Sequence, residues 1–116
     1  MANNNIHRVI IGETGQVLQS TLFDDNGAIP LTGYTVTIRV STKANKTIIN
    51  NESCVVLDQV ANQGKITFTY DALVATYPNL VAGDHRIRFK LVNPSGKISY
   101  VPKLKKDTFG VFRAIA

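Results

Sequence analysis

Few side chains in this sequence could carry out acid–base, nucleophilic or metal chemistry. Its 116 residues include two histidines, His7 and His85, and one cysteine, Cys54. Each histidine lies in a strand-like run among basic residues, and no neighbouring ligand has the spacing of a metal site, so we interpret both as exposed or rim histidines. Cys54 precedes an apolar run with no identifiable base nearby, which is typical of a small buried hydrophobe. We therefore expect no enzymatic activity, no catalytic, cofactor-binding or metal-binding residue, and no cofactor.

Two loop motifs resemble ligand sites but each lacks a required residue. The Asp-Asp-Asn at 24–26 resembles the start of a calcium-binding loop, yet position twelve of that loop falls on Thr35 instead of glutamate. We predict a hairpin turn there, because the Asn-Gly at 26–27 suits positive φ angles. The glycine-bounded segment 12–15 lacks Gly-Lys-Ser/Thr and a following helix, so we interpret it as a turn between two strands.

Basic residues form the candidate binding pattern of this chain. It carries 13 Lys and Arg against 8 Asp and Glu, a net charge of +5, and the positive charge is spread along the sequence. Three basic residues alternate on one strand face, where they either pair with carboxylates of a partner or form a solvated outer face. The candidate partner-binding residues are this basic set, Arg86, Arg88 and Lys90, and the apolar Phe109, Val111 and Phe112 near the end of the sequence.

A basic chain also permits nucleic acid as a partner. A surface for single-stranded nucleic acid needs aromatic side chains among the basic ones, but Phe68, Tyr70 and Phe89 fall on the apolar faces of their strands. The absence of tryptophan argues against a carbohydrate-binding platform. Nucleic acid is therefore not favoured as a partner, and a small basic module that binds nucleic acid or carbohydrate remains an alternative function.

These side chains are positioned by strands in which apolar and polar residues alternate with a period of two. The alternation is clearest in segments 34–41, 65–70 and 85–91, and it is what a half-buried antiparallel strand requires. The predicted inward-facing residues are Val36, Ile38 and Val40, then Ile66, Phe68 and Tyr70, then Ile87, Phe89 and Leu91. Segment 17–23 also alternates, but either of its faces could point inward.

Turn residues at 24–27 and 93–96 predict two hairpins between further short strands. Segment 71–77 begins with an N-cap aspartate and ends before a proline, so it is the candidate helix, of two turns at most. The pattern predicts an all-β fold: a single antiparallel β-sandwich with an immunoglobulin-like arrangement, about 8 short strands and at most one short helix. Residues 1–116 are predicted to form one domain, with 108–116 as a candidate docking segment.

Five segments follow one another in an order that resembles a known family. They are GETGQVL (12–18), LFDDNGAIPLTGYTVTIRV (22–40), GKITFTY (64–70), LVAGDHRIRFKL (80–91) and PSGKISYVP (94–102). Across residues 6–102, their order and spacing resemble the N-terminal domain of the baseplate upper proteins of tailed phages that infect Gram-positive bacteria. The motifs consist of turn residues and alternating strands, so their order carries the resemblance.

The resemblance implies a β-sandwich that docks on the distal tail protein ring at the tip of the phage tail and has no catalytic residues. Longer members of the family continue into a helical linker, whereas this sequence ends with FRAIA (112–116). We therefore predict a structural virion protein, a baseplate or tail-tip adaptor in host attachment, whose partners are other tail and baseplate proteins and which forms a homo-oligomer in the virion. A capsid decoration or head-surface protein is the alternative.

Other features of the sequence agree with assembly in the host cytoplasm. It has no apolar run long enough to cross a membrane, no secretory signal pattern, and a single cysteine that cannot form an internal disulfide. The apolar segment 108–116 packs either on its own domain or on a neighbour. For the docking interpretation we expect truncation after Thr108 to leave the fold intact and to abolish assembly.

Overall fold

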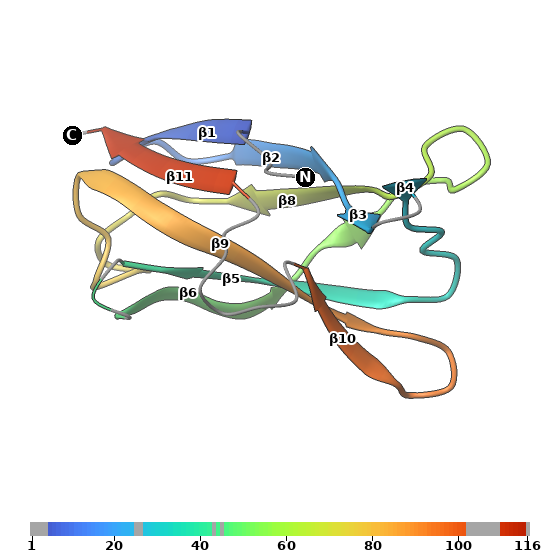
Figure 1. The fold of residues 1–116 in the computed structure, drawn as a ribbon. Coiled ribbons are helices and arrows are strands. Elements are labelled where there is room, and N and C mark those ends of the chain that lie inside the picture. Colours follow the sequence, from blue (N-terminus) through green and yellow to red (C-terminus); the bar gives the residue numbers. More distant parts are fainter. Residues whose placement is uncertain (1–4, 25–26, 43, 45, 102–109, 116) are drawn as a thin grey trace.

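The chain forms an all-β structure in which two main sheets share one core (Figure 1). The computed structural model describes residues 5–24, 27–42, 44, 46–101 and 110–115. The strands of this part are β1 (Asn5–Ile10), β2 (Gln16–Thr21), β3 (Phe23–Asp24), β4 (Gly27–Ala28), β5 (Thr35–Ser41), β6 (Thr47–Ser53), β7 (Val55–Val56), β8 (Lys65–Tyr70), β9 (Gly83–Val92), β10 (Ile98–Val101) and β11 (Gly110–Ile115). Within these residues there is no helix that could span a membrane.

The larger sheet has the strand order β1-β11-β9-β5-β6, and β10 also pairs with β9. The ten-residue strand β9 pairs with β5 along one edge, while its other edge pairs first with β11 and then with β10. All these pairs are antiparallel except β1 with β11, which run parallel from Asn5 opposite Gly110 to Ile10 opposite Ile115, so the larger sheet is mixed and the purely antiparallel arrangement predicted from the sequence is wrong here. The strands nearest the two ends of the sequence therefore lie side by side in one sheet.

The smaller sheet has the order β2-β8-β7, and β3 and β4 form a separate short hairpin. Segment 17–23, for which the sequence did not decide the inward face, is divided at Leu22. Strand β2, which pairs with β8, ends before this residue, and β3 begins after it. Leu22 is fully buried, and its N–H donates to the Gly64 carbonyl at 2.7 Å. Gly64 has a φ of +77°, and a Cβ atom there would lie 2.8 Å from the Leu22 carbonyl oxygen, so this crossing requires glycine.

The core follows the predicted alternation. In β5, β8 and β9 every inward-facing residue predicted from the sequence is buried, and Phe89 is the largest of the fully buried side chains. Buried residues from both main sheets form one hydrophobic cluster, joined by Leu31 and Leu80 from the connections. The alternation thus identifies which face of each sheet points away from the core.

Two predictions about the elements are corrected by the structure. Residues 71–77 form turns and no helix: the Tyr77 N–H donates to the Leu73 carbonyl at 2.8 Å, but this single helical turn does not continue into Pro78. The described part of the chain has eleven strands instead of about 8, since several are two-residue pairings that alternation cannot detect. The predicted hairpins at 24–27 and 93–96 are both confirmed.

Candidate interaction surface

The three basic residues predicted from the sequence lie together on β9, on the face of the larger sheet that points away from the core. Arg86, Arg88 and Lys90 are half-buried and alternate with the buried Ile87 and Phe89. Residues two apart in a strand are about 6.8 Å apart, so the three cations form a regular row along the strand. The structure thus confirms the predicted facing of these residues.

A fourth cation, Arg39 of β5, extends this row across the sheet. Arg39 is exposed and lies directly opposite Arg88, while Thr37 and Ser41 are opposite Lys90 and Arg86. We call Arg39, Arg86, Arg88 and Lys90 the basic face. Sequence reasoning missed Arg39, although its place between the inward-facing Ile38 and Val40 already indicated that it points outward; the missing information was the β5–β9 pairing.

Tyr100 of β10 contributes an aromatic ring to the same face. It lies opposite Lys90 in the β9–β10 hairpin and is 39% exposed. The Arg88 guanidinium carbon lies 4.1 Å from the centre of the Tyr100 ring, which is a cation–π contact. The sequence interpretation found aromatic residues only on inward faces, and Tyr100 was overlooked because its strand is short.

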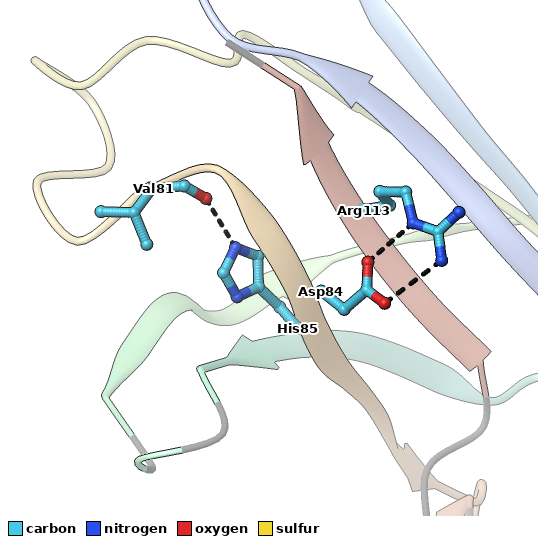
Figure 2. A network of polar contacts seen from close by, with 4 residues as sticks. All are labelled: Val81, Asp84, His85 and Arg113. Carbon is cyan, nitrogen blue, oxygen red and sulfur yellow. Dashed lines mark hydrogen bonds and ion pairs between the residues drawn. The ribbon is translucent and has the colours of Figure 1, made fainter.

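Three cations of the basic face have no ion-pair partner within the described residues. Asp84 lies on the same face of β9, but its carboxylate accepts hydrogen bonds from Nε and a terminal nitrogen of Arg113 on β11, at 2.7 and 3.2 Å (Figure 2). Within the described residues, no ion pair involves Arg39, Arg86 or Lys90. Arg39 and Arg88 place two like charges directly opposite each other in the β5–β9 pair.

The second predicted set of partner-binding residues is the apolar Phe109, Val111 and Phe112, of which the structure describes the backbone of the last two. Phe109 lies outside the described residues. Val111 and Phe112 belong to β11, where the backbone register places them opposite Arg86 and His85 of β9. Because β11 also pairs with β1 on its other side, the backbone of this segment is occupied within its own sheet. The structure thus brings the terminal strand beside the basic face but places it inside the fold.

Of the two histidines expected at exposed or rim positions, only His85 is buried. His85 is only 5% exposed because it alternates inward with Ile87, and its Nε2 lies 2.7 Å from the Val81 carbonyl oxygen (Figure 2). His7 is half-buried, with Nε2 2.7 Å from the Tyr70 hydroxyl, and burial lowers its pKa. Sequence reasoning missed the buried position of His85, because its basic neighbours suggested a solvated strand.

Other reactive groups in the described residues form no recognisable reaction centre. Burial, followed by the charge of Glu52, raises the pKa of Cys54 to about 12, so its sulfur stays protonated near neutral pH. No group of three or more His, Cys, Asp or Glu side chains within the described residues could hold a metal ion. Asp24 lies in β3, and the next two residues of the calcium-like motif are outside the described residues.

Comparison of this chain with protein-family models, with curated proteins and with solved structures found no match.

Proposed function

We propose that this protein is a non-enzymatic structural component of a tailed-phage virion, a baseplate or tail-tip adaptor that docks on the distal tail ring. The order of sequence motifs over 6–102 supports the family resemblance. The basic face is the observation that carries the docking role, because it is a regular cationic surface on a sheet held by a buried core.

We also propose that the two main sheets pack as an immunoglobulin-like β-sandwich. In that fold the strands G, F, C and C′ form one sheet and B, E and D form the other. The orders β11-β9-β5-β6 and β2-β8-β7 follow these two sequences when the strands are lettered along the chain, with β1 beside β11. The β3–β4 hairpin is then an insertion between the second and third strands of the sandwich, and β10 is an additional strand between those matched to F and G.

The docking mechanism follows from the geometry of the basic face. Arginine guanidinium groups bind carboxylates through two parallel hydrogen bonds, so Arg39 and Arg86 suit an acidic protein surface better than lysines would. A partner strand with carboxylates at alternate positions has the same spacing of about 6.8 Å as the cations of β9.

A nucleic-acid-binding module is the second candidate function, and Tyr100 is the observation that favours it. An exposed ring beside cations is the usual component of a surface for single strands. However, Arg88 already covers one side of this ring, and within the described residues no second aromatic side chain lies on the outer face of β5, β9 or β10. Binding to random single-stranded DNA that falls steeply with added salt would favour this candidate over the adaptor.

Charge reversal tests the docking role. We expect the pair Arg86→Glu and Lys90→Glu to weaken binding to the isolated distal tail ring by at least about tenfold, because both charges face the acidic partner. The matched control is the pair Lys46→Glu and Lys65→Glu, which changes the net charge equally outside the basic face. Titration by biolayer interferometry measures both. Equal loss in the two pairs would contradict a role for the basic face and indicate dependence on net charge.

A further inference from the structure

The outer edges of the two main sheets differ in how they are protected from pairing with another chain. Natural edge strands are blocked by charges, bulges, prolines or shortness. The pairing of β6 with β5 contains two register shifts, and Asn51 of β6 has a φ of +50°. Strand β7 has two residues and β10 has four, so both are too short to pair extensively with another chain.

The edge strand β1 is protected by a charge and by a side chain. Arg8 is charged and exposed, and the Gln16 side chain bonds both the N–H and the carbonyl of Ile10, at 3.0 and 2.9 Å.

Strand β2 has none of these protections. Its six residues, QVLQST, include no charge and no proline, and they pair with β8 without a register shift from Gln16 to Thr21. Val17 is 53% exposed and Gln19 is also exposed, so the outer face of the strand is open to solvent. Long, regular and uncharged edges of this kind are templates for strand addition.

The backbone groups of β2 that point away from β8 can be identified from the register. In an antiparallel pair, hydrogen-bonded and non-hydrogen-bonded positions alternate. Leu22 donates its N–H to Gly64, so the even-numbered residues of β2 bond to β8. The N–H and carbonyl groups of Val17, Gln19 and Thr21 therefore point to the free edge.

We propose that β2 pairs antiparallel with β2 of a second copy of this chain, about a two-fold axis at Gln19. In this register Gln19 lies opposite its own copy, and Val17 lies opposite Thr21 of the second copy. All outward-pointing groups of these residues are then matched, because each hydrogen-bonded pair exchanges two hydrogen bonds. The two smaller sheets become one continuous sheet across the dimer.

The occupant is a second copy because the edge is self-complementary. In a two-fold symmetric contact the same strand of both copies forms the interface, so the charges of a charged edge strand would face like charges and repel. Strand β2 is neutral in a chain of net charge +5, and an acidic partner has a better surface in the basic face. A glutamine at the axis both donates and accepts a side-chain hydrogen bond with its copy. This contact uses a different surface from the docking proposed above and does not depend on it.

The test combines light scattering with charge variants at the axis. We expect the wild-type chain to show a monomer–dimer equilibrium over a roughly hundredfold range of concentration. Gln19→Lys and Gln19→Glu should each weaken the dimer by at least about fivefold, since like charges then face each other. Mixing the two variants should restore a heterodimer. Thr69→Lys is the matched control: it lies on the exposed face of central strand β8. Three strand spacings across the dimer and four residues along the strands place it about 20 Å from its copy, beyond the screening length.

Each alternative result is distinguishable. A wild-type monomer over the whole range overturns the proposal, as does a dimer weakened no more by Gln19→Lys than by Thr69→Lys. Far-UV circular dichroism verifies that each variant is folded. Amide hydrogen exchange gives an independent readout, because the amides of Val17, Gln19 and Thr21 should become protected only on dimerisation. Protection elsewhere without protection there would place the interface on another surface.

Discussion

Truncation after Thr108 is expected to abolish the cooperative unfolding transition of this protein. The deletion removes β11, which lies between β1 and β9 and forms a full ladder with β1. It also removes the buried Ala114 and the Arg113 partner of Asp84. Among the described strands β1 pairs with β11 alone, so its core residue Val9 would lose its position as well. Domains of this size have a free energy of unfolding of only about 5–15 kcal/mol. Losing two of the six strands of the larger sheet should cost more than that.

This expectation replaces the one drawn from the sequence, which treated 108–116 as separable from the fold. Thermal circular dichroism and a proton–nitrogen correlation spectrum of the truncated chain measure the outcome. A chain that ends after Ile115 is the control, because it retains all of β11. A cooperative transition with native chemical shift dispersion in the truncated chain would contradict the structural role of β11 and restore the docking interpretation.

Gln59→Leu is expected to lower the free energy of unfolding by about 2–4 kcal/mol. The half-buried Gln59 side chain joins three backbone segments. Its Oε1 accepts hydrogen bonds from the N–H groups of Leu31 and Gly64, at 2.9 and 2.8 Å. Its Nε2 donates to the carbonyls of Leu57 and Asn62, at 2.7 and 3.3 Å. Leucine has a similar volume but would leave these donors and acceptors without their partner, which is the costly case for hydrogen bonds away from solvent.

The matched control for this substitution is Gln63→Leu. The exposed Gln63 side chain donates a hydrogen bond to the Ala28 carbonyl at 2.8 Å. We expect its replacement to cost about 1 kcal/mol or less, because water can replace this bond. Chemical denaturation of both variants gives the comparison. Equal losses would show that the Gln59 network contributes no more than an ordinary surface hydrogen bond.

The sequence was sufficient for the features that depend on local pattern. Alternation identified the inward residues of β5, β8 and β9, and the Asn-Pro-Ser-Gly turn identified the β9–β10 hairpin. It could not predict the parallel pairing of β1 with β11, because that contact joins residues about a hundred positions apart. The role of Gln59 was equally hidden, since a glutamine among turn residues gives no sign of which backbone groups it will meet.

The candidate surface was predicted in part for the same reason. Arg86, Arg88 and Lys90 share one strand, so their common face follows from the period of two alone. Arg39 and Tyr100 join them only through pairing with β9, which alternation does not specify. The buried position of His85 shows the opposite failure: the period placed it inward with Ile87, but its charged neighbours outweighed the period in the interpretation.

The most direct test of the proposed virion role is immunogold electron microscopy of phage particles purified from a culture that produces this protein. For a tail-tip adaptor we expect gold label at the tip of the tail, where the distal tail ring lies, in particles washed free of unbound protein. Label over the head would instead indicate a capsid decoration protein. Particles without label, in a lysate where the free protein is abundant, would contradict a structural role in the virion.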